Sequence, residues 1–160
     1  MPIYIVMGVS GSGKSTMAQK FANAVVADWL DADAFHTAEK KSQMAAGIPL
    51  TDADRWPWLD RLNAELRDFE AEGKTVFLAC SALKQRYRDR LVAGLPEARF
   101  IYLKGSPEVI RARLEQRRNH FMPPSLLQSQ LADLEEPQDA LVLDVSRTEK
   151  ELVEDFRRTL

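Results

Sequence analysis

Apolar residues along the chain gather in short runs, and longer stretches with helical spacing separate these runs. Four runs are rich in branched and aromatic residues, namely 3–7, 76–80, 99–103 and 141–145, and a weaker run ends near Asp31. Each run is mostly apolar instead of alternating, which is typical of parallel strands covered on both faces. The regular exchange of strand and helix patterns therefore predicts an α/β sandwich with right-handed crossovers.

Two stretches do not fit a simple alternation of strands and helices. Residues 34–72 hold two consecutive helical patterns, one over 37–46 and one that is expected to open at Pro57, with no strand between them. Residues 117–137 hold a short helix between prolines. Insertions of this kind in α/β domains often close over ligands. We therefore expect one domain over residues 1–160, with a substrate-binding insertion at about 34–72 and a lid at about 117–137.

The segment directly after the first apolar run carries a complete phosphate-binding motif. It reads GVSGSGKS over residues 8–15, which matches G-x-x-x-x-G-K-[ST], and a helical pattern follows it. Glycines let such a loop wrap around phosphate oxygens, while the helix N-terminus supplies backbone donors and a positive dipole. Lys14 is expected to act on the β and γ phosphates of ATP and Ser15 to bind Mg²⁺. The residues expected to hold the nucleotide here are Gly8, Ser10, Gly11, Ser12, Gly13, Lys14, Ser15 and Thr16.

Two carboxylates, Asp31 and Asp33, end the second strand pattern. In an open α/β sheet, the carboxyl ends of the strands border the ligand crevice. Alternate residues of an extended segment point in opposite directions, so the two aspartates are expected to divide two tasks. We assign Asp31 to the magnesium shell, and Asp33 to orienting an acceptor hydroxyl and taking its proton. His36 is a weaker candidate for substrate contact, because a lone histidine is more often a hydrogen-bonded structural residue.

Charge is distributed unevenly along the chain. The formal net charge is −2, but residues 84–118 hold ten basic and only four acidic residues. A basic segment in an acidic protein indicates a site for a small anion better than a nucleic-acid track. Lys84 and Arg88, four residues apart, are expected to share a helical face at the crevice and to bind a substrate carboxylate or the transferring phosphate. Arg113 and Arg117 repeat this spacing and are expected over the nucleotide; solvated helix faces are the alternative.

Cysteine content and apolar run length exclude several classes of protein. The single cysteine, Cys80, cannot form an internal disulfide or a multi-cysteine zinc cage, and it fits a reducing compartment. Because Cys80 ends an apolar run, we expect a small buried residue and not a nucleophile. No apolar run is long enough to span a membrane and no secretory signal is evident, so a cytoplasmic location is the default expectation.

Five further motifs follow the loop in order along the chain. They are DADAFH (31–36), MAAGIPLTDADRWPWL (44–59), CSALKQRYRD (80–89), FIYLKG (100–105) and HFM (120–122). With the loop, this set resembles gluconate kinase (gluconokinase) over essentially the whole chain. The resemblance implies ATP-dependent phosphorylation of D-gluconate at its 6-hydroxyl. It also implies a three-layer P-loop kinase fold, with a five-stranded parallel sheet of order 2-3-1-4-5, a helical insertion and a lid.

The resemblance also implies roles for individual residues. By similarity to the related shikimate kinases, Asp33 contacts the acceptor and Arg55 is a candidate for its carboxylate, which a guanidinium matches in bidentate geometry. A surface charge at a helix start is the alternative for Arg55. His120 belongs to the lid and to the expected substrate contacts, although the lid reads RRNH where many members have lysine and glycine before the histidine. Because dimers are common in this family, we expect a homodimer with a small-molecule substrate, no nucleic acid and no membrane.

Two other functions stay open at this point. A related kinase for shikimate or another polyhydroxy acid would use the same loop, and only the segment 44–59 favours gluconate. A regulatory or nucleic-acid-associated NTPase would use the loop as a conformational switch. The acidic pI of about 5.8 and the short chain argue against that last function.

Overall fold

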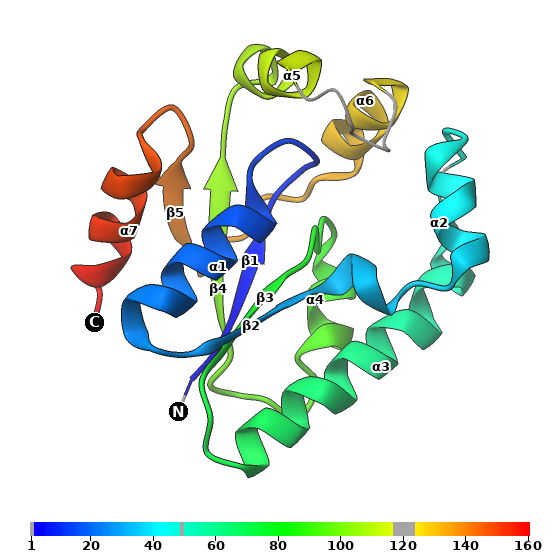
Figure 1. Cartoon of the computed structure of the whole chain (residues 1–160). Coiled ribbons are helices and arrows are strands. Elements are labelled where there is room, and N and C mark those ends of the chain that lie inside the picture. Colours follow the sequence, from blue (N-terminus) through cyan, green and yellow to red (C-terminus); the bar gives the residue numbers. More distant parts are fainter. Residues whose placement is uncertain (1, 49, 117–123) are drawn as a thin grey trace.

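The computed structural model describes residues 2–48, 50–116 and 124–160 and shows a parallel sheet between two layers of helices (Figure 1). The five strands lie in the order β2-β3-β1-β4-β5, which confirms the predicted class and strand order. Each predicted strand agrees with the structure to within one residue at either end. The strands are β1 (Ile3–Met7), β2 (Asp28–Asp31), β3 (Val76–Ala79), β4 (Arg99–Lys104) and β5 (Leu141–Asp144).

The connections between the strands are helical, and threonine caps three of the helices. The side chains of Thr37, Thr51 and Thr148 each accept a hydrogen bond from the backbone N–H three residues on, which satisfies one of the unpaired donors of the first turn. The helices are α1 (Lys14–Val25), the 3₁₀ helix η1 (Ala32–Phe35), α2 (Ala38–Ala45), α3 (Asp52–Ala71), α4 (Gln85–Leu91), α5 (Pro107–Gln116), α6 (Pro124–Asp133) and α7 (Glu149–Arg157).

The prediction that α3 opens at Pro57 is wrong, because the helix begins five residues earlier at Asp52. Thr51 and Asp54 form a capping box, in which each side chain accepts from the backbone N–H of the other. The apolar spacing starts only after Pro57 because the first turn meets polar neighbours instead of the sheet. Lys40 of α2, for example, donates to Asp54 at 2.5 Å.

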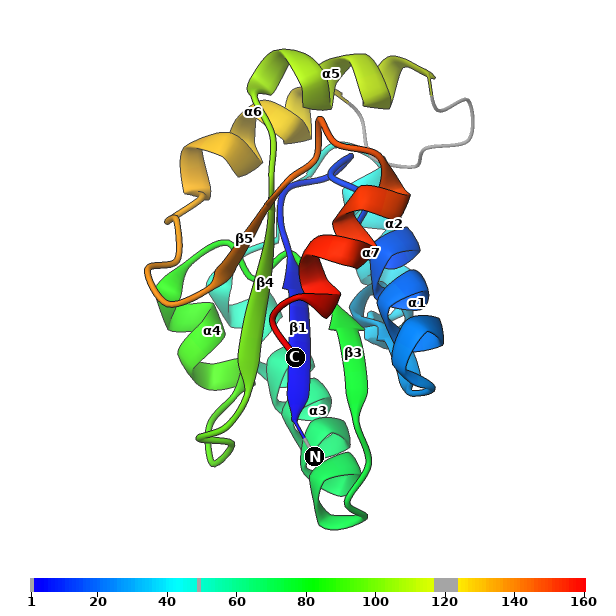
Figure 2. The ribbon, with the colours of Figure 1, turned by 90° about the vertical axis from the view of Figure 1, so that its left-hand side faces the viewer.

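The two faces of the sheet are covered by different helices (Figures 1 and 2). Alternate residues of β1 point to opposite faces: Tyr4 and Val6 join the core under α1 and α7, whereas Ile3 and Ile5 join the core under α3 and α4. All residues of β1 are buried because it pairs with β3 on one side and with β4 on the other. This arrangement explains why the strand patterns are continuously apolar.

The carboxyl ends of the strands meet at one edge of the sheet, where α2, α5 and α6 also lie (Figure 1). The loop after β1, the 3₁₀ turn after β2 and the loop after β3 all leave this edge, so the predicted chemistry gathers there. Among the helices that the structure describes, none combines the length and apolar character required to cross a membrane.

Candidate active site

The loop between β1 and α1 has the backbone conformation that a phosphate site requires. Gly11 and Gly13 have φ values of +86° and +92°, and a Cβ at Gly11 would lie 2.9 Å from Cγ of Leu114. Gly13 is also the N-cap of α1, where no side chain caps the helix and no acidic residue occupies the first turn. The start of α1 therefore has no side-chain cap and no carboxylate beside it, which suits it to bind an anion.

A buried hydroxyl beneath the loop supports the same interpretation. Ser12 is 1% exposed, and its Oγ has no hydrogen-bond partner within the described parts of the chain. A Cβ at Gly8 would lie only 2.7 Å from this oxygen, so glycine is needed for the close approach. A buried polar atom without a partner costs about 1–3 kcal/mol, and a phosphate oxygen would supply the acceptor. The loop thus fits nucleotide phosphates.

Ser15 and Asp31 bring two oxygen ligands together beside the loop. The Ser15 hydroxyl donates to Oδ2 of Asp31 at 3.1 Å, and Oδ1 of Asp31 accepts from the backbone N–H of Asp33 at 3.0 Å. Mg²⁺ prefers such hard oxygen ligands and usually shares them with substrate phosphates. No group of three His, Cys, Asp or Glu residues in the described chain is arranged to hold a metal alone.

Asp33 lies in η1 and not in an extended strand, so the strand-based argument for opposite directions does not apply to it. Asp31 instead caps this turn and directs its carboxylate to Ser15, while the half-exposed Asp33 side chain lies 4.0 Å from Nε2 of His36. The two carboxylates therefore face different neighbours, as the predicted division of tasks requires, although the turn and not the strand separates them.

His36 is a buried neutral group at this edge of the sheet. Burial lowers its pKa to about 4, and the positive charge of Arg55 adds to the effect. Its ring stacks on Trp58 of α3 with 4.1 Å between the centroids, and the Trp58 indole N–H donates to the carbonyl of Ala32 at 2.9 Å. Trp58 therefore fixes the turn that carries Asp33. The sequence indicated Trp58 only as a core residue of an amphipathic helix.

Arg55, in the first turns of α3, belongs to the same edge of the site. Its Nη1 donates to the carbonyl of Leu50 at 2.7 Å and to the hydroxyl of Tyr87 at 3.0 Å. The guanidinium carbon also lies 4.8 Å from the centre of the Tyr87 ring. Arg55 is therefore held in a fixed orientation between α3 and α4, which a surface charge at a helix start would not be.

Lys84 and Arg88 do not share a helical face, contrary to the prediction. Lys84 is the N-cap of α4 with extended backbone angles, and its ammonium lies 3.8 Å from Asp133 at the end of α6. Arg88 lies inside the helix, but it is 2% exposed. The spacing of four residues was misleading because α4 begins at Gln85, one residue after Lys84.

The Arg88 guanidinium binds the backbone of two separate segments. It donates to the carbonyls of Ala82 and Leu83 at 2.7 and 3.1 Å, and to the carbonyl of Glu135 at 2.8 Å. Ala82 has a φ of +46°, a left-handed conformation that is unfavourable for a residue with a Cβ. In this structure Arg88 thus supports the loop after β3 and joins it to the segment that follows α6. Its predicted contact with substrate or phosphate stays a prediction.

Arg113 lies against the loop, as predicted for a residue near the nucleotide. Its Nη1 is 3.7 Å from the position of a Cβ on Gly13, and its Nη2 donates to the carbonyl of Val145 at 2.5 Å. Arg117 and His120 fall outside the described residues. Sequence reasoning missed Gln130 of α6, whose Oε1 accepts from the backbone N–H of Ser10 at 2.6 Å, because no motif surrounds it.

Cys80 is buried at the end of β3, and burial raises the pKa of its thiol to about 12. A thiol with so high a pKa is protonated at neutral pH and is a poor nucleophile. The prediction of a small buried residue is confirmed.

Comparisons with known proteins connect this geometry to a family. A family model described as an AAA domain matches residues 3–137. The thermosensitive gluconokinase of Escherichia coli (strain K12) is 41% identical over 98% of this chain and 86% of that relative. The chain belongs to the gluconokinase family. The predicted resemblance is thereby confirmed.

Two solved structures show how closely the chain follows other members of the gluconokinase family and their fold. A gluconokinase from Sinorhizobium meliloti 1021 has a TM-score of 0.86 at 42% identity, covering 96% of this chain and 88% of that one. An unliganded sugar kinase from Janibacter sp. HTCC2649 has a TM-score of 0.93 at 45% identity, covering 99% and 93%. Sheet order, loop and helical insertion therefore occur here in a fold that solved kinases share.

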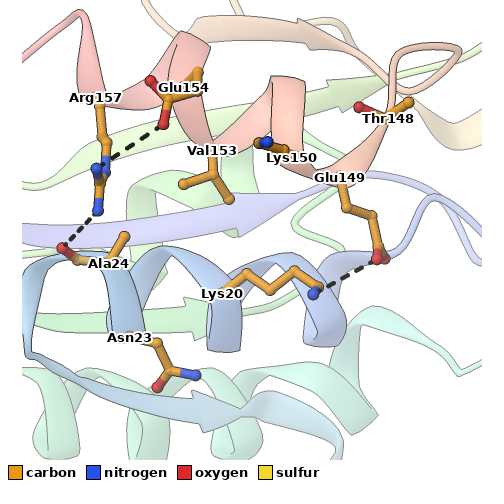
Figure 3. A pocket seen from close by; sticks show the side chains of 9 residues that line it. All are labelled: Lys20, Asn23, Ala24, Thr148, Glu149, Lys150, Val153, Glu154 and Arg157. Atoms are coloured by element: carbon orange, nitrogen blue, oxygen red, sulfur yellow. Dashed lines mark hydrogen bonds and ion pairs between the residues drawn. The ribbon is translucent and has the colours of Figure 1, made fainter.

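A groove between α1 and α7 lies apart from the gluconokinase-like site (Figure 3). None of its lining residues belongs to the predicted site, and its charges pair with one another. Lys20 lies 3.7 Å from Glu149, while Arg157 lies 3.9 Å from Glu154 and donates to the carbonyl of Ala24. The Lys20–Glu149 ion pair and the Arg157–Ala24 hydrogen bond join the two helices.

Proposed function

We propose that this protein transfers the γ-phosphoryl group of ATP to the 6-hydroxyl of D-gluconate, giving 6-phosphogluconate. One observation carries the phosphoryl-transfer part: Asp31 and Asp33 stand at the carboxyl end of β2, with Asp31 bonded to Ser15 of the phosphate loop. Membership in the gluconokinase family supports gluconate as the acceptor.

The loop residues hold the nucleotide in this proposal. The backbone N–H groups at the start of α1 and the buried Ser12 hydroxyl bind phosphate oxygens, and Lys14 adds a positive charge at the β and γ phosphates. Ser15 holds Mg²⁺ directly, and Asp31 holds it or its waters. When bound, ATP supplies the phosphoryl group and Mg²⁺ neutralises charge on its oxygens. Arg113, beside Gly13, steadies the nucleotide.

Residues of η1 and α3 hold the acceptor. Asp33 accepts the proton of the attacking hydroxyl and orients its oxygen toward the loop. The neutral His36 ring contributes a hydrogen bond without a competing positive charge. Arg55 binds the carboxylate at the other end of the sugar acid in bidentate geometry. With these groups fixed in place, catalysis rests on positioning and on charge neutralisation.

Several further contacts remain part of the proposal. Lys84 binds the substrate or the transferring phosphate from the loop after β3, and Arg88 assists through the same loop. Arg117 and His120 act from the lid. Residues of about 34–72 form the substrate-binding insertion of a single domain, and residues of about 117–137 form the lid. The homodimer rests on the family resemblance, and analytical ultracentrifugation tests it.

A substrate panel tests the proposal. The protein is incubated with Mg-ATP and gluconate, shikimate, glucose or nucleoside monophosphates, and ADP release is measured, with EDTA as the control for metal dependence. We expect gluconate to stimulate ADP release and EDTA to abolish it. Release stimulated by shikimate but not by gluconate would identify the related kinase instead. Hydrolysis that no acceptor stimulates would favour the regulatory NTPase.

A further inference from the structure

The hydroxyl of Tyr87 stands between an arginine and an aspartate of α3. It accepts from Nη1 of Arg55 at 3.0 Å and donates to Oδ1 of Asp52 at 2.6 Å, while the Tyr87 ring is buried at the start of α4. We propose that Tyr87 is a positioning residue, which keeps Arg55 available to the substrate carboxylate by holding Asp52 out of direct hydrogen-bond contact with it. This inference rests on the proposed function.

Arg55 contacts the fold through one nitrogen of its guanidinium, Nη1. Its hydrogen bonds within the described chain, to Leu50 and Tyr87, both use Nη1. The edge formed by Nη2 and Nε is the one that suits a carboxylate in bidentate geometry. Among charged groups, Arg55 has the largest effect on the pKa of His36, and the His36 ring lies 4.0 Å from Asp33. The same substrate molecule can therefore meet Arg55 and Asp33.

The carboxylate of Asp52 can compete with the substrate carboxylate for the guanidinium of Arg55. Its Oδ1 lies 3.7 Å from Nη1 of Arg55, which makes a loose ion pair but no direct hydrogen bond. The Tyr87 hydroxyl occupies Oδ1, and Arg86 occupies Oδ2 at 2.7 and 2.8 Å. These bonds, led by that of Tyr87, hold the pKa of Asp52 below its usual value, so the carboxylate stays charged. Without the hydroxyl, Oδ1 would have Arg55 as its nearest cation.

The ring of Tyr87 has a separate packing role that a test must preserve. It makes an edge contact with Trp56 at 5.9 Å between centroids, and the guanidinium groups of Arg55 and Arg86 lie over it at 4.8 and 5.2 Å. Phenylalanine keeps this ring and removes only the oxygen. The substitution Tyr87→Phe therefore isolates the two hydrogen bonds.

Steady-state kinetics with gluconate and Mg-ATP test the inference. We expect Tyr87→Phe to raise KM for gluconate about tenfold, the loss typical of one hydrogen bond to a charged group, while kcat and KM for ATP change less than twofold. Adding Asp52→Asn to Tyr87→Phe should recover much of that loss, because the rival charge is gone. A residue that served only the packing of α3 on α4 would not give this recovery.

Arg86→Gln is the matched control, because it removes the other partner of Asp52 and leaves Arg55 and Tyr87 in place. It should leave KM for gluconate within twofold. An unchanged KM in Tyr87→Phe, or no recovery in the double variant, overturns the inference while the proposed function stands. If the unsubstituted protein does not turn over gluconate, the proposed function fails instead. In that case a double-mutant cycle of Tyr87→Phe and Arg55→Ala, measured by urea unfolding, still tests whether the two side chains interact. Additive changes in the free energy of unfolding would show that they are not coupled.

Discussion

Under α1 and α7, aromatic rings of the sheet and the helices pack on one another, whereas under α3 and α4 the aromatic side chains also bind polar groups. Tyr4 and Phe77 stack at 4.6 Å between centroids, and Phe156 meets both rings edge-on. On the other face, the indole of Trp58 and the hydroxyl of Tyr87 donate hydrogen bonds to η1 and to α3.

This difference follows the two tasks of the site. The phosphate loop uses backbone groups, which need a rigid support more than particular side chains. The cluster of Tyr4, Phe77 and Phe156 lies directly beneath α1 and supplies that support. The proposed acceptor side needs individual polar atoms in fixed places, and hydrogen bonds from buried aromatic residues join α3 to η1 and α4 to α3 there. The proposed nucleotide-binding loop and the proposed acceptor-binding residues are therefore supported from opposite faces of the sheet.

The largest expected effect is on chemistry at the acceptor side. Asp33→Asn keeps the shape of the side chain but removes the base, so we expect kcat to fall about 10²–10⁴-fold with little change in ATP affinity. Initial rates with gluconate and a fluorescent nucleotide titration measure the two quantities. Unchanged turnover would remove Asp33 from its proposed role. Asp31→Asn is the control, which should instead raise the Mg²⁺ concentration needed for half-maximal rate.

The next prediction compares how much a substitution on each face of the sheet lowers the free energy of unfolding. Phe77→Ala leaves a cavity in the ring cluster, and we expect the free energy of unfolding in urea to fall by about 3–5 kcal/mol. Trp58→Phe, its counterpart on the other face, removes one hydrogen bond and should cost only about 1 kcal/mol. Its kcat should nevertheless fall severalfold, because the turn carrying Asp33 loses its anchor. Equal stability losses would contradict the contrast between the faces.

A smaller effect appears in the pH dependence of stability. His36 titrates at about 4 when folded, below the value of 6.5 expected when unfolded, so the unfolded chain binds more protons between these values. The contribution of His36 to the free energy of unfolding should therefore be complete above pH 6.5 and should fall by about 3 kcal/mol as the pH drops to 4. Asp54, whose pKa is lowered to about 2 by Lys40, titrates below this window.

Urea titrations at several pH values test this dependence, with His36→Gln as the control. The glutamine variant should lack most of the slope between pH 4 and 6.5. A slope of the same size in both proteins would show that other groups are responsible.

The smallest effect lies far from both faces, at the end of α1. Val26 has a φ of 55° and is 95% exposed, so a branched side chain adopts a left-handed conformation without packing in return. We expect Val26→Gly to raise the free energy of unfolding by about 0.5–1 kcal/mol, because glycine is the usual residue at this position of a helix end. Val26→Ala retains a Cβ and should gain less. Thermal unfolding measures both, and equal gains would mean that backbone strain is not the cause.

The strands and the phosphate loop could be predicted from the sequence because local spacing carries them, whereas the strand order came from the resemblance to gluconate kinase. Asp31 and Asp33 were also accessible, since the carboxyl ends of parallel strands share one edge. The inward position of Arg88 was not, because its partner at Glu135 lies 47 residues away along the chain. Helical spacing predicts on which side of a helix a charged residue lies. It does not reveal that backbone carbonyls of distant segments surround that side.

The polar roles of Trp58 and Tyr87 were hidden for a related reason. Both residues carry large rings that fit the apolar face of a helix, so nothing in the sequence indicated a polar role. Their N–H and O–H groups matter only once η1 and α3 are packed together. Tertiary contacts, and not the local pattern, decide which aromatic residues of this chain position the site.

The bare N-terminus of α1 has a consequence for the lifetime of the protein. Three other helices hold a threonine cap worth about 1 kcal/mol, whereas no side chain caps α1, so an anion bound by the loop would stabilise this helix end instead. Resistance to heat and to proteolysis then rises with the logarithm of ligand concentration, by about 2.7 kcal/mol at a hundredfold excess over Kd. If the cellular concentration of the bound anion fell, the protein would unfold more often and would be degraded sooner. The abundance of the protein would then depend on the concentration of that anion.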